Sequence, residues 1–432
     1  MFGCSVVVAW HSVIVAHSHA HSFEEPRRPR LAGALAVVVG IVAIVSVLGM
    51  VLLWPSSDDI PTGAGPLSNP GVSLVDATVT GVEPFDCGST GIGPDNTPMV
   101  EGDCAQITAT TEDGEDAEFT LDPTRYVGAG MNDGDAVQLI RDAPPEQEVV
   151  FQFYDYQRGN QLLIMAAVFA ILVVAIARWR GLFGLLGIGV AMLVLLQFIL
   201  PALLAGKPAL AIAVVGSVVI MLVVLYLAHG VSIRTTAALL GTLFGVGFTA
   251  VAGAWATNWA HLTGVGSEDD HLLVASAPGM SLSGVVAATM VIAGLGVLND
   301  VTVTQASAVW EMRGLQPSAG PAQLFTSAMR IGRDHIASSV YTLVFAYAGS
   351  AMTVLLLLTV YRQDLMQFIT TEQIGQEIVR TLIGAVGLVL AVPATTAIAV
   401  ALAPAARTET DLDGGDHRRA PHAGGAHATD AS

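Results

Sequence analysis

Four polar side chains recur at helical spacing in the weakly apolar stretch 281–313: Asp300, Thr304, Ser307 and Glu311. Offsets of 4, 7 and 11 residues return to nearly the same side of an α-helix. A carboxylate buried in such a stripe can exchange a proton or bind a cation, because burial disfavours its charged form. The pattern therefore predicts a polar stripe that faces the inside of a helical bundle, with Asp300 as its leading residue.

The length of the apolar run before Asp300 leaves two interpretations. Residues 284–298 are fewer than the roughly 20 needed to cross a bilayer as a helix. In the first interpretation the helix continues and carries Asp300 toward the membrane, where a central charge costs about 2.5–3.5 kcal/mol on insertion scales and is retained for a reason. In the second, the span ends at Asp300, and Glu311 lies on an ordinary cytoplasmic helix, paired with Arg313 or with solvent.

A second group of charges lies further along the chain, at Arg330, Arg333, Asp334 and His335. Arg330 and Asp334 are four residues apart and can pair on one helix turn. Anchoring of a span at the membrane surface is the favoured interpretation of this group. For Asp300, the predicted partners are Arg313, Arg330 or Arg333, or else a coupling cation.

Motifs of known enzyme classes are missing from the sequence. It contains no nucleophile elbow, phosphate loop, HExxH helix or paired CxxC, so we expect neither an enzyme nor a bound cofactor. The acidic clusters 112–116 and 133–135 lack the spacing of a calcium loop and predict hairpin turns. The histidines of both tails are typical of low-complexity segments rather than metal sites: His17, His19, His21, His417, His422 and His427.

The composition is that of a membrane protein. Of the 432 residues 53% are hydrophobic and 12% charged, whereas soluble domains carry about a quarter charged residues. We therefore predict a polytopic α-helical membrane protein whose main partner is the lipid bilayer. The apolar runs indicate about eight transmembrane helices, near 31–54, 161–177, 182–204, 209–228, 235–256, 281–300, 337–360 and 379–402.

Residues 55–158 have a different pattern. Short stretches with β-branched or aromatic residues at every second position alternate with turn signals, which predicts a small β-rich domain, an OB-like barrel or a sandwich. Twenty of the 36 acidic residues lie here against three arginines, so the segment repels phosphate and nucleic acid is excluded as a partner. Cys87 and Cys104 fall in it, and a disulfide between them is predicted if it faces an oxidising compartment. Two free buried thiols remain the alternative.

The distribution of arginines predicts the orientation. Threading the spans from a cytoplasmic N-terminus places 12 of the 18 basic residues in the cytoplasm, so both termini are expected there, in a bacterial-type plasma membrane. The β-rich domain is then extracytoplasmic. The expected parts are a cytoplasmic tail (1–30), the first transmembrane helix (31–54), the acidic β-rich domain (55–158), a seven-helix membrane domain (159–403) and a disordered cytoplasmic tail (404–432).

Small residues repeat at helical spacing in the predicted spans, at Gly241 and Gly245, Gly284 and Ala288, and Gly384 and Gly387. Such residues let two helix backbones approach closely in lipid. Tight packing within the chain is the favoured interpretation, and a homo-oligomer face is the alternative.

Several stretches together resemble the YibE/F family of multi-pass membrane proteins: HGVSIRTTAALLGTLFGVGFTA (229–250), AGLGVLNDVTVTQASAVWEM (293–312), MRIGRDHIASSVYTLVFAYAGSA (329–351), EIVRTLIGAVGLVLAVPATTA (377–397) and, outside the membrane, DGDAVQL (133–139). The resemblance covers roughly residues 70–402. The chain departs from the family pattern at Asn299, where Met is usual, and at Tyr341, where Asn is common. The family has no established biochemical activity, so the resemblance implies an architecture and not a reaction.

Two functions from different classes remain. The first is a transporter or permease for an ion or small solute, with the stripe around Asp300 lining its path. The second is a non-transporting membrane scaffold or envelope sensor that acts through the β-rich domain. A buried Asp300 favours the first, whereas an exposed Asp300 and a pocket on the β-rich domain favour the second.

Overall fold

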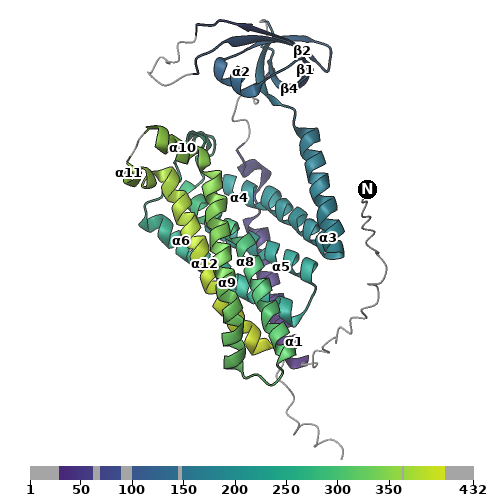
Figure 1. Cartoon of the computed structure of the whole chain (residues 1–432), viewed down its shortest axis with the longest axis vertical. Helices are drawn as coiled ribbons and strands as arrows, with labels where there is room; N and C mark the ends of the chain where they lie inside the picture. Colours follow the sequence, from purple (N-terminus) through teal and green to yellow (C-terminus); the bar gives the residue numbers. More distant parts are fainter. Residues whose placement is uncertain (1–28, 62–68, 89–99, 145–147, 362–363, 404–432) are drawn as a thin grey trace, which may run out of the picture.

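The chain has a curled β-sheet domain and a larger helical part (Figure 1). The computed structural model describes residues 29–61, 69–88, 100–144, 148–361 and 364–403. The histidines expected in the two tails, and the tails themselves apart from residues 29 and 30, lie outside these ranges.

The β domain is a single antiparallel sheet with the strand order β3-β2-β1-β4-β5. Phe119 of β3 and Phe153 of β5 stack with ring centroids 6.1 Å apart, so the two edge strands face each other. The sheet is therefore curled into a small, partly open barrel, as the alternating pattern predicted. Its elements are β1 (Val72–Phe85), β2 (Cys104–Thr111), β3 (Asp116–Leu121), α2 (Pro123–Ala129), β4 (Ala136–Asp142) and β5 (Val150–Tyr156).

The core of this domain is formed by every second side chain of its strands. Along β3, exposed and buried residues alternate without exception, because successive side chains of a strand point to opposite faces. Ile107, Leu121 and Leu139 are almost fully buried on the inner face. A disulfide joins Cys87 to Cys104, with 5.6 Å between their Cα atoms, and ties the segment after β1 to the start of β2.

Long helices make up the rest of the chain: α1 (Pro29–Leu53), α3 (Gly159–Val194), α5 (Ala209–His229), α6 (Ile233–Trp259), α8 (Leu282–Leu315), α9 (Pro321–Ser350) and α12 (Glu372–Leu402). Shorter elements connect them: η1 (Ser57–Asp59), the π-helix η3 (Leu195–Ile199), α4 (Leu200–Leu204), α7 (Glu268–Ser276), α10 (Met352–Tyr361) and α11 (Leu365–Ile369).

Six helices among the described residues are long and apolar enough to cross a membrane, and the bent pair α9–α10 makes a seventh. One of the six is the 46-residue run Gly159–Leu204. Its backbone leaves the helical conformation at Arg178 (φ 56°, ψ −135°), between the two spans predicted there. The expected eight spans require these two parts to be counted separately, and that number stays a prediction.

Two helices extend beyond the spans predicted on them, and one of these spans is bent. The span expected at 281–300 is part of α8, which continues to Leu315 because its residues beyond Asp300 still pack against neighbouring helices. The span expected at 337–360 is not one straight helix. Helix α9 already begins at Pro321, where proline suits the first helical turn, and the chain bends by 62° between α9 and α10.

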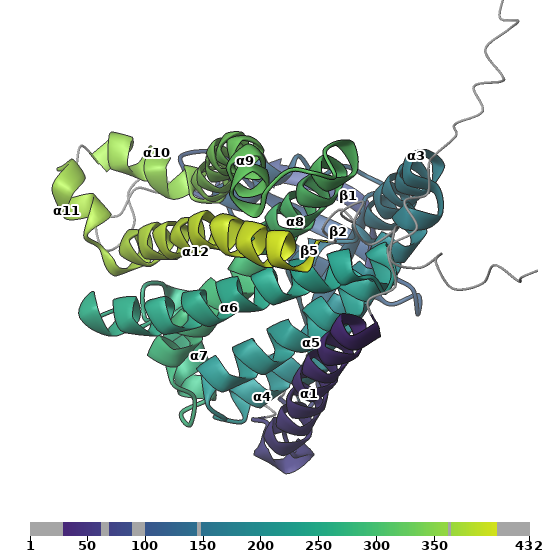
Figure 2. The ribbon, with the colours of Figure 1, turned by 90° about the horizontal axis from the view of Figure 1, so that it is seen from below.

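Helices α6, α8 and α12 form the centre of the helical part, and α8 also packs against α5 and α9 (Figures 1 and 2). Glycines allow this approach. A Cβ at Gly241 of α6 would lie 2.0 Å from Oγ1 of Thr395 on α12, and one at Gly245 would lie 2.6 Å from Cδ2 of Leu298. The small residues thus serve packing within the chain, as favoured from the sequence.

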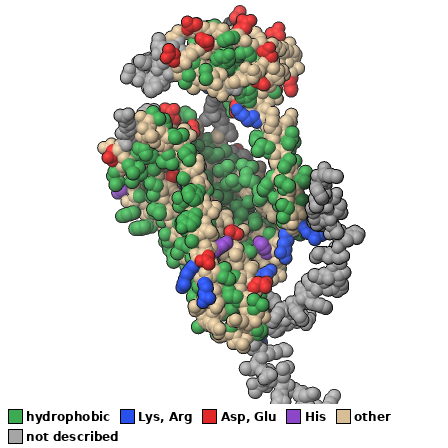
Figure 3. Space-filling model, in the orientation of Figure 1, with side chains coloured by type: hydrophobic (Ala, Val, Ile, Leu, Met, Phe, Trp, Pro, Cys, Tyr) green, Lys and Arg blue, Asp and Glu red, His purple; other side chains and the backbone are tan. Residues whose placement is uncertain are grey.

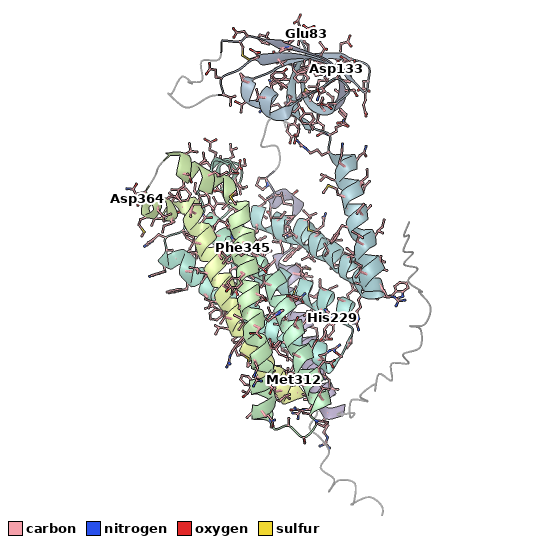
Figure 4. All side chains as sticks on the ribbon, viewed as in Figure 1. Glu83, Asp133, His229, Met312, Phe345 and Asp364 are labelled. Carbon is pink, nitrogen blue, oxygen red and sulfur yellow. A yellow bond between two sulfur atoms is a disulfide. The ribbon has the colours of Figure 1, made fainter. Side chains whose placement is uncertain are left out.

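Charge is distributed unevenly along the molecule (Figure 3). Acidic side chains cover the β domain, whereas the arginines of the helical part gather toward the opposite end. In Figure 4, Asp364 lies at the end of the helical part near the β domain, and Met312 lies toward the other end. We refer to these as the β-domain end and the arginine end.

Candidate functional site

The predicted polar stripe lies on α8, but it does not face the interior of the bundle. The Asp300 side chain is 69% exposed, Glu311 is exposed, and Thr304 and Ser307 are half-buried. The buried face of α8 carries Thr302, Gln305 and Val309 instead. The predicted burial of Asp300 inside the bundle is therefore wrong, because helical spacing shows which residues share a face and not where that face points.

Asp300 pairs with a histidine of the neighbouring helix. Its Oδ2 lies 3.5 Å from Nε2 of His335 on α9, and the two atoms form an ion pair when the imidazole is protonated. The Nε2 atom has almost no exposed surface and makes no hydrogen bond with another described residue. Thr304 does not contact the carboxylate: its hydroxyl donates to the main-chain oxygen of Asp300, one helical turn back, at 2.8 Å.

The arginines expected to neutralise Asp300 form other hydrogen bonds or are exposed to solvent. Arg313 is buried and donates from Nη1 to the main-chain oxygens of Pro317 (3.4 Å) and Ala319 (2.7 Å), which closes the turn between α8 and α9. Arg330 and Arg333 are exposed on α9. Among the described residues no ion pair joins Arg330 to Asp334 or Arg313 to Glu311. The expected arginine partners of Asp300 were wrong, and the pairing of Arg330 with Asp334 is not formed.

The position of Asp300 along α8 fixes its depth. At 1.5 Å per residue, Asp300 lies about 27 Å along the axis from Leu282. A hydrocarbon core about 30 Å thick that begins at Leu282 ends close to Asp300. The carboxylate is then near the boundary of the apolar layer and not at its centre.

The stripe continues toward the arginine end into a small polar cavity. Ser307 of α8 lines it together with His229 at the end of α5 and Arg234 at the start of α6. Its solvent-sized space is only about 10 Å³, so at most one water fits between these side chains. Figure 4 places His229 toward the arginine end, on the side of the bundle where α3 turns. The stripe thus runs from the pair Asp300–His335 to a basic rim.

Hydrogen bonds between helices hold α8 in this orientation. Thr242 of α6 and Thr302 of α8 are fully buried, with 2.7 Å between their hydroxyl oxygens. Gln305 donates from Nε2 to Oγ1 of Thr396 on α12 (2.7 Å) and to the main-chain oxygen of Ala328 on α9 (3.0 Å). Such neutral bonds across helices are typical of membrane bundles, where an unpaired polar group is costly.

A glycine brings His335 to Asp300. A Cβ at Gly332 would lie 2.7 Å from Cγ1 of Val392 and 3.0 Å from Oε1 of Gln305, so only glycine lets α9 approach α8 and α12 there. His335 follows one helical turn later. The sequence carries a signal for this contact in the spacing of Gly332 and His335, which lie three residues apart on one helix face.

A second, apolar cavity lies at the β-domain end, between α9, α10, α11 and α12. It holds about 280 Å³, and its walls include Tyr347, Phe368 and Glu377. Glu377 forms an ion pair with Arg380 one turn further along α12. Apart from this carboxylate the lining residues are almost all apolar, so the cavity suits an apolar chain and offers no reactive group.

The chemistry available at the stripe is proton or cation exchange. The pair brings a carboxylate oxygen and an imidazole nitrogen within 3.5 Å of each other, and these are groups that bind protons and cations. The described residues contain no cluster of three or more His, Cys, Asp or Glu side chains that could hold a metal ion. The carboxylate of Asp300 paired with His335 is the leading site in this part of the chain.

Comparison with known proteins agrees with this architecture. No curated protein and no solved structure matches the chain. The model of the YibE/F-like protein family matches residues 165–405, which include α5, α6, α8, α9 and α12 and leave out the β domain. More than half of the chain lies in this match, and the chain therefore belongs to the YibE/F-like protein family.

Proposed function

We propose that the chain is a transporter or permease for an ion or small solute, with the pair Asp300–His335 as its proton- or cation-binding site. The observation that carries the proposal is this pair, a carboxylate 3.5 Å from an imidazole on two long neighbouring helices. Ionisable residues in membrane segments are costly and commonly mark ion or proton pathways. The family match covers the helices that carry the pair, so the pair lies within the part of the chain that defines the family.

The orientation is part of the proposal. The arginine end faces the cytoplasm of a bacterial-type plasma membrane, both termini lie there, and the acidic β domain lies outside. The segregation of basic and acidic side chains supports this arrangement (Figure 3). Solute would then reach the pair Asp300–His335 from the cytoplasmic side, past the basic rim of His229 and Arg234.

Two observations favour the second candidate, a non-transporting scaffold or envelope sensor. Asp300 is exposed, and a polar cavity lies where the β domain meets α3. The two candidates differ in the role of Asp300, because a sensor that acts through the β domain does not require a charge on α8.

Complementation of a deletion strain separates them. Asp300→Asn keeps the shape of the side chain and removes its charge, so we expect normal expression and the phenotype of the deletion. Glu311→Gln is the matched control, since Glu311 shares the stripe and is exposed without an ion pair among the described residues, and it should complement. Full complementation by Asp300→Asn would contradict the transporter proposal.

A further inference from the structure

A polar cavity of about 450 Å³ lies at the junction of the β domain and the first turn of α3. Its size is within the range of about 300–1,000 Å³ that is typical of small-molecule sites. Strands β1 and β4 supply Asp76, Ala136 and Gln138, and the end of β5 supplies Tyr156. The remaining wall is the segment 157–161, immediately before the apolar part of α3.

The lining groups offer unused hydrogen-bonding capacity. Gln138 donates from Nε2 to Oδ1 of Asp76 at 3.0 Å, which orients both side chains and leaves Oδ2 of the carboxylate and Oε1 of the amide as acceptors. Asn160 and Gln161 are exposed, and their side chains make no hydrogen bond with another described residue. Each of these two amides supplies two N–H donors and one acceptor. Donors and acceptors thus face the same space from two sides.

The charged side chains of the lining restrict which ligands can bind in this cavity. Arg158 is committed to Asp155, with 2.7 Å between Nη1 and Oδ1, and this hydrogen bond lowers the pKa of Asp155. Its guanidinium also lies 5.6 Å from the centre of the Tyr156 ring. Asp76 is then the one carboxylate among the lining residues, in a domain covered by further acids (Figure 3). Anionic ligands are repelled, and one carboxylate is too few for a tight metal site.

We infer that this cavity binds a saccharide, neutral or amino-substituted. Neighbouring hydroxyls of a sugar each donate and accept, which matches a wall that combines one carboxylate with the four amide side chains of the lining, Gln138, Gln157, Asn160 and Gln161. The cavity adjoins the start of the apolar run of α3, so the saccharide is a soluble glycan or the headgroup of a glycolipid. This inference does not depend on whether the helical part transports a solute.

The test uses the full-length protein in lipid nanodiscs. The soluble probes are maltose, cellobiose and di-N-acetylchitobiose, measured by saturation-transfer NMR and by calorimetry. The membrane probe is a glucosyl-diacylglycerol in the nanodisc, measured by native mass spectrometry. Binding in the first arm alone identifies a soluble glycan, and binding in the second alone identifies a glycolipid headgroup.

Three variants locate the binding. The double variant Asn160→Ala/Gln161→Ala removes two exposed amides, and Ala136→Trp fills the cavity without removing any of its polar groups. Each should weaken binding at least tenfold while circular dichroism and the Cys87–Cys104 disulfide stay unchanged. Gln152→Ala is the matched control, because Gln152 is an exposed amide of β5 outside the cavity, and it should bind like the wild type. Failure of every probe to bind, or binding that both cavity variants leave unchanged, would overturn the inference.

Discussion

Replacement of Gly241 by alanine tests the contact on which the helical packing depends. The added Cβ would lie 2.0 Å from Oγ1, 2.8 Å from Cβ and 3.1 Å from Cγ2 of Thr395. Two of these distances are below 3.0 Å, so α6 and α12 must move apart. Overpacking of this kind costs about 1–3 kcal/mol of the free energy of unfolding. We therefore expect Gly241→Ala to be destabilised by that amount.

Gly247→Ala is the matched control on the same helix. Nothing lies within 4 Å of a Cβ at Gly247, so this variant should lose no stability and can gain up to about 1 kcal/mol from the higher helix propensity of alanine. Both free energies are measured by reversible unfolding in mixed detergent micelles, followed by circular dichroism. Thr395→Ala should partly rescue Gly241→Ala, because it removes Oγ1 and Cγ2 but leaves the Cβ atom at 2.8 Å.

Equal stability of Gly241→Ala and Gly247→Ala would refute this account of the packing. A change in oligomeric state without a change in stability would point to the alternative, in which the glycines lie at an interface between copies of the chain.

Three further predictions concern the β domain and the orientation. Removal of the disulfide by Cys87→Ser/Cys104→Ser should cost about 3 kcal/mol in the chain-entropy model. Amide hydrogen exchange of β1 and β2 measures this loss of stability. Unchanged protection of these strands would show that the disulfide does not stabilise the domain. The hydrogen bond from Arg141 lowers the pKa of Glu115 from its ordinary value of 4.5. The ionised Glu115 therefore stabilises the folded domain fully above about pH 4.5, and this stabilisation is lost as the pH falls through the lowered pKa. The amide hydrogens of β3 should exchange faster in Glu115→Gln than in the wild type, and this difference should shrink as the pH is lowered. A difference that grows on acidification would contradict the predicted pH dependence. In whole cells, an impermeant thiol reagent should label a cysteine at Asp113 and not one at Arg180, and the reverse pattern would invert the proposed topology.

The sequence was sufficient to predict features that depend on composition and on the spacing of apolar residues along one segment. Continuous apolar runs predicted the helices, because backbone groups in lipid must be satisfied within one segment. Alternation predicted the β domain, and β3 follows that alternation residue by residue. The family was also recognised from the sequence, and the match to residues 165–405 confirms it.

The sequence was not sufficient for features that depend on neighbours. Spacing placed Asp300 and Glu311 on one face of α8, but the glycines of α6 and the threonines of α12 pack against the opposite face. The buried polar contacts were missed because threonine and glutamine in an apolar run carry no periodic signal of their own. The backbone break at Arg178, in contrast, lies in the gap between the predicted spans 161–177 and 182–204, where Arg178 and Arg180 interrupt the apolar run.

The most direct test of the central claim is solute flux into proteoliposomes that contain the wild-type protein or Asp300→Asn, prepared side by side. Protons, alkali and divalent cations, and a panel of small metabolites are measured against empty liposomes. We expect at least one of them to move at least tenfold faster with the wild type, and Asp300→Asn to return that rate to the level of empty liposomes. A rate that Asp300→Asn leaves unchanged, or a wild type that moves none of the solutes, would contradict a transport role for the pair Asp300–His335.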